Sequence, residues 1–323
     1  MSRHPAPHAD ATSPAPRTSI VVVTWRSAAD LRRLIASLRL HLDHGIELVV
    51  VDNASGDGAE AELDPWPGAR RFIALDRNLG YGGAVNRGIE AAAGEAILVL
   101  NADTEVVDAS LEQLARWAHA RRAIAGPLIL TSDGSRQPSA SGPPTGAWPW
   151  LGAVVSGRLQ PPALRARTEP WRLERTVAVS WLGGACIAGP RDVLRSLGPF
   201  DPAIHLYGED MDLGLRAARA GVDSYFCPDV ARLIHHARGS SSQLLPAGPW
   251  DLIARNRRAV LRRQFGARRE RSSQAALLLN LGLRVASKGL LRRDASRERA
   301  ALRASLGARA VPPLPPSPTS TTT

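Results

Sequence analysis

Runs of β-branched and other apolar residues alternate in the first part of the chain with patterns that repeat at the helical period. The apolar runs cover residues 19–25, 46–55, 71–78 and 95–106. Apolar residues at helical spacing occupy 29–42 and 81–94. Continuous Val, Ile and Leu runs that are joined by helices are typical of a parallel sheet covered on both faces. The pattern therefore predicts an α/β domain with a mostly parallel sheet.

The second part of the chain is less regular. Turn residues are dense in 126–152, which predicts a loop, with a mobile lid as one interpretation. An apolar run at 176–190 precedes a short helical pattern with a glycine C-cap. Residues 200–221 predict a helix with acidic residues at its start and a glycine at its end, as the helix dipole and C-cap preferences favour. The next strand ends in the paired histidines His235 and His236.

Polar residues follow each apolar run of the predicted sheet. They are Thr24 and Trp25, Asp52 and Asn53, Asp76 to Asn78, and Asn101 to Asp103. In open parallel sheets ligands bind outside the carboxyl ends of the strands, because loops converge there and helix N-termini point their free N–H groups outward. We therefore expect the functional residues at this edge of the sheet.

Three acidic clusters fall at predicted ligand-facing positions: Asp52, Asp103, and Glu209 and Asp210 with Asp212. A single acid at a strand end is more often only a loop residue. Hard carboxylate oxygens suit Mg²⁺ or Mn²⁺, so Asp103 beside a nucleoside diphosphate would hold a divalent cation. Glu209 and Asp210 are adjacent in the first turn of a helix and can point to different sides. One could orient a substrate hydroxyl while the other accepts its proton as a general base.

The net charge of +11 is concentrated near the C-terminus. Between Asp251 and Val311 there are sixteen Lys and Arg residues against four Asp and Glu residues, so the rest of the chain is close to neutral. The pattern there is helical, which predicts a basic amphipathic extension over 250–311. Residues 1–18 are rich in Pro, Ala and Ser, lack the apolar core of a secretory signal, and predict a disordered leader. The low-complexity residues 312–323 predict a disordered tail.

The composition indicates a cytoplasmic protein. The best candidate for a membrane span, at 275–283, falls far short of the roughly 20 apolar residues that a span needs. The two cysteines, Cys186 and Cys227, are too few for a disulfide framework and lie in no metal-binding spacing. We expect them to be small buried residues.

Seven motifs follow one another in the chain: VVVTW, VVVDNAS, RNLGYGGAVNRGI, LVLNADTEV, WLGGACIAGPRDVLRSLGPFD, YGEDMDLGLRAARAG and HHARGSS. Their order resembles that of the family 2 glycosyltransferases of GT-A fold, over about Ser19 to Ser242. The closest likeness is to the rhamnosyltransferase-like branch, which builds bacterial cell-wall, O-antigen and exopolysaccharide chains. The resemblance implies a Rossmann-like GT-A catalytic domain over 19–249. Its nucleotide-binding half would be 19–106 and its acceptor half 107–249.

The resemblance also implies which residues meet the nucleotide-sugar donor. They would be Thr24, Asp52, Asn78, Gly80, Gly82, Gly83, Asn101 and Asp103. Asp52 would bond the pyrimidine base. Asp103 keeps the last carboxylate of the family's Asp-x-Asp metal motif, whereas Asn101 replaces the first. His236 matches a histidine that completes the metal shell in some members, and His235, one residue out of register, is expected to pack.

The reaction that the resemblance implies is inverting sugar transfer with Mg²⁺ or Mn²⁺. Asp210 matches the family's catalytic base, and Glu209 would contact the acceptor or the donor. Small residues would let the acceptor approach closely, and these are Gly183, Gly184 and Ala185; a tight turn is the other explanation for the glycines. L-rhamnose would pass from dTDP-rhamnose to a hydroxyl of a cell-envelope glycan or a polyprenyl-linked acceptor. A galactofuranosyl or hexosyl transferase that uses a UDP-sugar is the alternative.

Other classes of function fit the sequence less well. A dinucleotide-binding oxidoreductase is disfavoured because GYGGAVNRG lacks the Gly-x-Gly-x-x-Gly spacing and follows the third apolar run. The Arg-rich extension suggests a nucleic-acid- or membrane-binding protein without catalysis. Apolar residues at helical spacing among the basic ones favour an anionic membrane surface, here the inner face of the cell membrane, over nucleic acid. A hairpin packed on the catalytic domain, or on a second subunit of a homo-oligomer, is the other interpretation.

Overall fold

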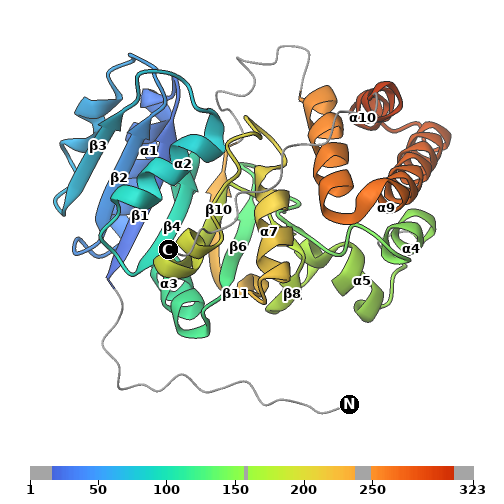
Figure 1. Cartoon of the computed structure of the whole chain (residues 1–323), viewed down its shortest axis with the longest axis horizontal. Coiled ribbons are helices and arrows are strands. Elements are labelled where there is room, and N and C mark those ends of the chain that lie inside the picture. The colour runs from blue at the N-terminus through green and yellow to red at the C-terminus, as the bar shows by residue number, and fades with distance from the viewer. Residues whose placement is uncertain (1–16, 156–158, 237–248, 309–323) are drawn as a thin grey trace.

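The computed structural model describes residues 17–155, 159–236 and 249–308. A mixed sheet forms its centre, helices cover both faces, and a group of C-terminal helices lies to one side (Figure 1). The expected α/β class, mostly parallel sheet and C-terminal helical extension are confirmed. The expected tail, and the expected leader apart from its last two residues, lie outside the described residues, as does the Gly-Ser-Ser segment after His236.

The sheet has the order β3-β2-β1-β4-β10-β6-β11-β5, with β8 paired to β11. Its strands are β1 Thr18–Thr24, β2 Glu47–Asp52, β3 Arg70–Ala74, β4 Ala96–Asn101, β5 Thr104–Val106, β6 Ile124–Leu130, β8 Val177–Val179, β10 Cys186–Pro190 and β11 Ser224–His235. Strands β1 to β4, β6 and β11 run in one direction, and β5, β8 and β10 run in the other. A separate two-stranded ribbon joins β7 Ala140–Ser141 to β9 Trp181–Leu182.

Helices cover both faces because β1 is apolar on both. Ile20 and Val22 pack with α1 and α3, whereas Val21 packs with α2, α6 and α7. The α-helices among the described residues are α1 Ala28–His41, α2 Gly80–Ala91, α3 Ser110–Arg121, α4 Trp148–Val154, α5 Pro162–Thr168, α6 Arg191–Ser196, α7 Glu209–Arg219, α9 Trp250–Leu290 and α10 Ser296–Gly307. Short 3₁₀ turns form at η1 Ala59–Leu63 and η2 Pro170–Arg172.

Two segments differ from the sequence-based prediction. The apolar run 95–106 forms two strands, because the chain turns at Ala102 and Asp103 and β5 then pairs antiparallel with β11. The turn-rich segment 126–152 is not a loop throughout, since it contains most of β6 and the start of α4. Cys186 and Cys227 are buried free thiols, as predicted.

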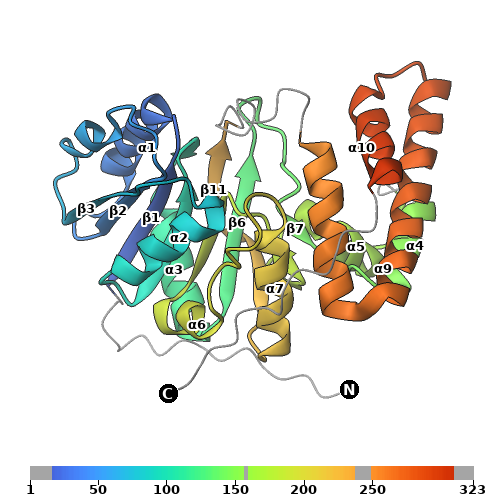
Figure 2. The ribbon, with the colours of Figure 1, turned by 45° about the horizontal axis from the view of Figure 1, so that its top comes forward.

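The C-terminal helices pack on the α/β domain (Figure 2). α9 is two helices joined at a kink, where Gly266 has φ +81° and ψ +165°. Before the kink, Val260 and Leu261 pack against Met211 and Leu215 of α7. After the kink, α9 runs beside α4 and α10. No helix in the described ranges has the length and apolar composition to cross a membrane.

Candidate active site

Tyr81 lies where several acids converge. It stands in the first turn of α2, and its hydroxyl donates a hydrogen bond of 2.7 Å to the carbonyl oxygen of Gly184. Burial raises the pKa of Tyr81 well above its usual range. Negative charges nearby raise it further, among them those of Glu209, Asp210 and Asp103. These acids are far apart in the sequence, so the tyrosine ring marks the centre of the candidate site.

Asp210 is held as a hydrogen-bond acceptor at the start of α7. Its Oδ2 accepts the N–H of Gly184 at 3.1 Å, and its Oδ1 accepts the N–H of Met211 at 2.7 Å. Burial raises the pKa of Asp210 above its usual range, although these N–H donors oppose the rise by stabilising the carboxylate. The group therefore combines a fixed orientation with a basicity higher than that of an exposed aspartate.

Glu209 differs from its neighbour in its protonation. Burial, together with the charge of Asp210, raises the pKa of Glu209 to about 8. Its Oε2 is buried and has no hydrogen-bond partner among the described residues. A carboxyl group with this pKa is mostly protonated at neutral pH, so it can donate a proton to a hydrogen bond. Glu209 and Asp210 thus offer one donor and one acceptor side by side.

The turn that precedes α7 is held by α9. Tyr207 and Gly208 both have positive φ, +62° and +100°. The side-chain amide of Asn256 donates hydrogen bonds of 2.9 Å and 2.8 Å to the carbonyl oxygens of Leu206 and Tyr207. A helix from the C-terminal extension therefore fixes the backbone directly before Glu209 and Asp210.

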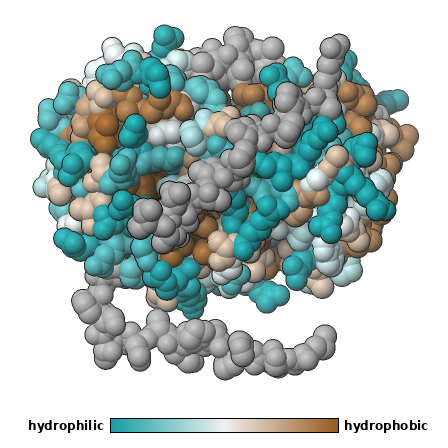
Figure 3. Space-filling model, viewed as in Figure 1, coloured by the Kyte–Doolittle hydropathy of each residue, from teal (hydrophilic) through white to brown (hydrophobic). Residues whose placement is uncertain are grey.

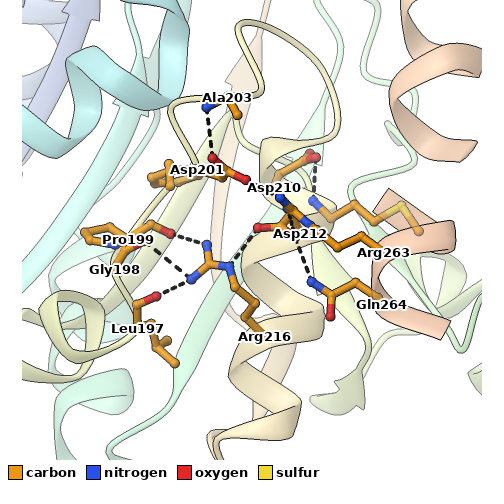
Figure 4. Close-up of polar contacts among 12 residues, drawn as sticks. Leu197, Gly198, Pro199, Asp201, Ala203, Asp210, Asp212, Arg216, Arg263 and Gln264 are labelled. Atoms are coloured by element: carbon orange, nitrogen blue, oxygen red, sulfur yellow. Dashed lines mark hydrogen bonds and ion pairs between the residues drawn. The ribbon is translucent and has the colours of Figure 1, made fainter. Parts of the chain in front are cut away.

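A buried charge network anchors the rest of α7 (Figure 4). Asp212 is fully buried and contacts Arg216 at 2.7 Å, Arg263 at 2.6 Å and Gln264 at 2.8 Å. Arg216 also donates to the carbonyl oxygens of residues 197–199, and Arg263 contacts Asp201 at 2.5 Å. Asp212 is thus committed to joining α7 to α9 and is not placed for chemistry. A buried acid with this many partners is costly to disturb.

The Asp103 carboxylate is paired with the side chain of His235, whereas His236 donates its backbone N–H to the carbonyl oxygen of Asp103 at 2.9 Å. His235 Nε2 lies 3.1 Å from Asp103 Oδ1, and its Nδ1 lies 2.9 Å from Gln137 Oε1. His236 instead contacts Glu105 Oε2 and Ser132 Oγ, each at 2.8 Å. The structure thus places His235, which the sequence analysis expected to pack, beside the Asp103 carboxylate, and His236, which it expected at the metal, beside Glu105 and Ser132.

The surroundings of Asp103 fit a divalent cation. The Oδ1 atom of Asn101 is buried and has no hydrogen-bond partner among the described residues. A carboxylate, an imidazole and an amide oxygen are donors that Mn²⁺ accepts. Within the described ranges, however, no three His, Cys, Asp or Glu side chains are grouped closely enough to hold a metal by themselves. Further ligands would have to come from the substrate or from water.

The residues expected at the nucleotide lie together at the strand ends. Asp52 accepts hydrogen bonds from the N–H and the hydroxyl of Ser55 and so closes the turn after β2. The hydroxyls of Thr24 and Ser27 lie 2.8 Å apart after β1. The side-chain amide of Asn53 donates to Asn78 at 3.0 Å. The N–H of Arg26 also donates to Ser55 Oγ at 2.9 Å, so polar contacts link the ends of β1, β2 and β3 along one edge.

The glycines after Asn78 have a structural explanation. Gly80 has φ +75°, and a Cβ there would lie 2.3 Å from the carbonyl oxygen of His205. A Cβ at Gly82 would lie 2.8 Å from Phe200 Cβ, and one at Gly83 would lie 2.9 Å from Leu79 Cβ. All three positions are filled by protein atoms, so close packing of α2 accounts for them without a nucleotide-sugar.

The segment expected to meet the acceptor lies against Asp210. A Cβ at Gly184 would make ordinary contacts, at 3.5 Å to Tyr81 and 3.8 Å to Asp210. The N–H of Gly183 donates to Ser139, and the carbonyl of Ala185 accepts from the N–H of Asn101 at 3.0 Å. The backbone of this segment thus spans from Asn101 to Asp210. Tyr81 and Asn256 were not predicted from the sequence, and only the glycine-rich context of Tyr81 offered a signal.

Comparison with known sequences finds relatives over most of the chain. The sequence model of the family described as Glycosyl transferase family 2 matches residues 19–156. An N-acetylglucosaminyl-diphospho-decaprenol L-rhamnosyltransferase of Mycobacterium tuberculosis is 34% identical over 248 residues, which are 69% of this chain and 77% of that protein. The O-antigen biosynthesis protein RfbC of Myxococcus xanthus is 31% identical over 236 residues, which are 70% of this chain and 18% of that protein.

Solved structures share the fold at lower identity. The mannosyltransferase PcManGT of Pyrobaculum calidifontis, in complex with GDP-Man and Mn²⁺, superposes with a TM-score of 0.57 at 17% identity. That likeness covers 93% of this chain and 87% of the mannosyltransferase. GalNAc-T7 with UDP, GalNAc and Mn²⁺ also gives a TM-score of 0.57, at 19% identity over 78% of this chain and 48% of that protein.

Proposed function

The chain belongs to glycosyltransferase family 2, and from this premise we propose that it is an inverting transferase of L-rhamnose from dTDP-L-rhamnose to a hydroxyl group of a lipid-linked acceptor in cell-envelope glycan synthesis. The identity of 34% to an L-rhamnosyltransferase, over more than two thirds of both chains, supports the sugar and the acceptor class. The observation that carries the reaction is the Asp210 carboxylate, oriented by Gly184 beside a protonated Glu209.

In the proposed mechanism Asp210 acts as the general base. Its Oδ2 accepts the proton of the acceptor hydroxyl, whose oxygen attacks the anomeric carbon from the face opposite the nucleoside diphosphate. The Gly184 N–H holds the Asp210 carboxylate in position. The raised pKa of Asp210 makes this carboxylate a better proton acceptor near neutral pH. The protonated Glu209 donates a hydrogen bond to a substrate oxygen. No nucleophilic side chain is required, because the acceptor oxygen displaces the diphosphate directly.

Asp103, His235 and Asn101 are the residues proposed to hold Mg²⁺ or Mn²⁺. The contact between Asp103 and His235 and the unpartnered amide oxygen of Asn101 support this set. A bound divalent cation would neutralise the charge that develops on the departing nucleoside diphosphate. Thr24, Asp52 and Asn78 are proposed to meet the nucleotide, because they lie along the same edge.

The Asp210→Asn variant tests the base. The amide is nearly isosteric but cannot accept the proton, so we expect the transfer rate to fall by roughly 10² to 10⁴ while donor binding persists. Transfer of radiolabelled sugar and calorimetric titration of the donor measure the two quantities separately. Asp223→Asn, an exposed carboxylate after α7, is the matched control. Turnover of Asp210→Asn near the parental rate would assign the base to another residue.

The choice of donor needs its own measurement. dTDP-rhamnose is proposed, and a UDP-linked galactofuranose or hexose is the alternative. A ligand that binds the folded state raises its melting temperature. A thermal-shift screen with dTDP- and UDP-sugars, each with Mg²⁺ or Mn²⁺, therefore ranks the donors. A selective shift with a UDP-sugar would replace the rhamnose proposal.

We also infer that the protein works at an anionic membrane surface on the cytoplasmic side. After the kink, α9 and its C-cap carry exposed apolar residues, namely Leu279, Leu283, Leu290 and the C-cap residue Leu291. Hydrophobic side chains are visible at the right margin of Figure 3, over the C-terminal helices. Basic residues flank them, and this combination favours a surface of anionic lipid.

A further inference from the structure

A pocket of about 220 Å³ lies between α9, the end of α5 and the segment before α4. Arg257, Ser273 and Arg284 of α9 line one side, and Arg167 and Glu169 of α5 and its C-cap line another. None of the acids of the candidate active site is in its lining. The pocket is therefore a separate feature that the proposed chemistry does not yet use.

The walls of the pocket are closely fitted. A Cβ at Gly142 would lie 1.7 Å from the carbonyl oxygen of Arg167, so the segment before α4 presses directly on α5. On the other side, the hydroxyl of the buried residue Ser273 donates a hydrogen bond of 2.5 Å to the carbonyl oxygen of Pro144. These contacts hold the segment before α4 against both α5 and α9, so the packing of the fold itself shapes the pocket.

The lining is rich in cations. Arg167, Arg257 and Arg284 face a single carboxylate, that of Glu169, which already pairs with Arg172 at 2.6 Å and with Arg284 at 3.2 Å. Such a lining attracts an anion.

Arg257 makes no direct contact with a carboxylate among the described residues. It donates to Ser273 Oγ at 2.7 Å and to Gln274 Oε1 at 3.4 Å, and both acceptors are neutral. Among the residues that the structure describes, it forms no ion pair. Burial lowers the pKa of Arg257 to about 10, and the charge of Glu270 opposes this decrease only in part. An anion in the pocket would supply the missing charge.

The pocket is connected to the catalytic base through one strand. Trp181 lines the pocket and begins β9, and that segment continues to Gly184, whose N–H binds Asp210. Trp181 also packs closely against α7, since a Cβ at Gly214 of that helix would lie 2.5 Å from the Cβ of Trp181. A molecule that reaches from the pocket along this strand would arrive at the base.

We propose that this pocket binds the phosphate groups of the acceptor, so that Arg257 and Arg284 hold the anionic link between the acceptor sugar and its lipid. The inference rests on the proposed function, because it takes the acceptor to be joined to lipid through a diphosphate, as in the substrate that the name of the mycobacterial relative gives. Guanidinium groups suit this task because their N–H donors match phosphate oxygens.

The surroundings suit the rest of such an amphiphile. Leu283 precedes Arg284 on α9, and Leu151 precedes the pocket residue Gly152 on α4; both leucines are exposed. α4 and α9 are joined here by a hydrogen bond of 3.1 Å from Asn280 to the carbonyl of Gly152. Apolar chain could therefore leave the pocket toward a lipid surface while the sugar extends along β9.

Direct binding tests the pocket without relying on turnover. Inorganic diphosphate is titrated by calorimetry in the presence of EDTA into the full chain, Arg257→Gln, Asp103→Asn and Arg255→Gln. Arg255 is exposed on the same helix and serves as the matched control. We expect Arg257→Gln alone to weaken binding, by about tenfold or more, the usual size for a charge-assisted hydrogen bond. No binding by the parent, an unaffected Arg257→Gln, or loss in Asp103→Asn would each overturn the proposal.

Kinetics then identify the source of the phosphate. With an N-acetylglucosaminyl-diphospho-lipid of short chain, Arg257→Gln should raise the acceptor KM about tenfold and leave kcat and the donor KM unchanged. Arg257→Lys, which restores the charge, should recover part of the loss. With an alkyl N-acetylglucosaminide that lacks phosphate, parent and variant should not differ. If Arg257→Gln instead loses only its binding to phosphatidylglycerol vesicles, the pocket holds a bilayer headgroup and the acceptor assignment falls.

Melting curves are recorded for every variant. A melting temperature of Arg257→Gln equal to that of the parent excludes misfolding as the cause of weaker binding. Failure of the proposed function would appear differently from failure of this inference. In that case no acceptor is glycosylated by the parent, while diphosphate binding still depends on Arg257.

Discussion

Glu209 and Asp210 are neighbours in one buried site, yet their surroundings give them different protonation states. Asp210 receives two N–H donors, whereas Glu209 has a buried carboxyl oxygen with no partner among the described residues. Two interacting acids whose environments move their pKa values apart are a common arrangement in acid and base catalysis. The cost of this arrangement should be measurable as stability.

Glu209→Gln should change how stability depends on pH. The pKa of Glu209 is about 8 in the folded protein and about 4.5 when exposed, so the folded state binds the proton more tightly. Parental stability therefore falls as pH rises from about 5 to 8, whereas neutral glutamine escapes this loss. We expect the variant to gain on the order of 3 kcal/mol relative to the parent between pH 5 and pH 9. Melting temperatures across that range measure it, and parallel curves for both proteins would contradict it.

His235→Ala should weaken the metal site, whereas His236→Ala should not. The His235 side chain contacts the Asp103 carboxylate and the His236 side chain contacts Glu105, so the loss of His235 removes the imidazole proposed as a ligand. We expect the Mn²⁺ concentration for half-maximal stabilisation of the protein to rise by roughly tenfold or more in His235→Ala. Thermal shift against Mn²⁺ gives this value for both variants. A larger effect in His236→Ala would restore the original assignment.

The sequence could indicate most single residues of the site but not how they pair. Polar residues at strand ends identified Asp52, Asn101 and Asp103, because the sheet gathers those ends. The choice between His235 and His236 depends on strand register, which is fixed by the pairing of His235 with Thr104. Successive residues on a strand face opposite sides, so a shift of one residue exchanges the two histidines.

At the scale of elements, the main relation is between α7 and α9. Met211 and Leu215 pack on the first half of α9, while Asn256 and Arg263 hold the two ends of this contact by polar bonds. The apolar runs predicted the strands and early helices within a few residues. They could not predict this contact, since its partners are about fifty residues apart and no local pattern links them.

The kink in α9 should depend on Gly266. Its φ of +81° and ψ of +165° fall in a region that is almost restricted to glycine. Gly266→Ala is expected to cost about 1–3 kcal/mol of unfolding free energy, although no atom would clash with the new Cβ. Gly282→Ala is the matched control, because Gly282 lies in regular helix with open space around it and should gain about 1 kcal/mol. Denaturant unfolding compares them, and equal effects would exclude backbone strain at the kink.

At the scale of the whole molecule, the basic extension both packs on α7 and carries exposed apolar residues. The half of α9 before the kink completes the packing of α7, so removing the extension would remove part of the catalytic domain's core. Truncation near Pro249 is therefore a poor test of membrane binding. The half after the kink carries the exposed leucines, and point variants there leave the α7 contact intact.

The double variant Leu283→Asn and Leu290→Asn should reduce binding to anionic vesicles. Leu283 is 45% and Leu290 is 87% exposed, so polar replacements disturb little packing but remove apolar area from a membrane contact. Recovery in flotation with phosphatidylglycerol vesicles should fall several-fold. Leu40→Asn, on α1 and 76% exposed, controls for general surface polarity. Equal recovery of all three proteins would place the membrane contact elsewhere or remove it.

The position of β10 has a consequence for how the chain is made. β10 lies antiparallel between β4 and β6, although it comes after both in the sequence. On the ribosome the outer edge of β4 therefore stays open until synthesis has passed Pro190. Open strand edges invite pairing with other nascent chains. Residues 19–106 therefore form a sheet whose edge at β4 is covered only by a strand that is synthesised much later.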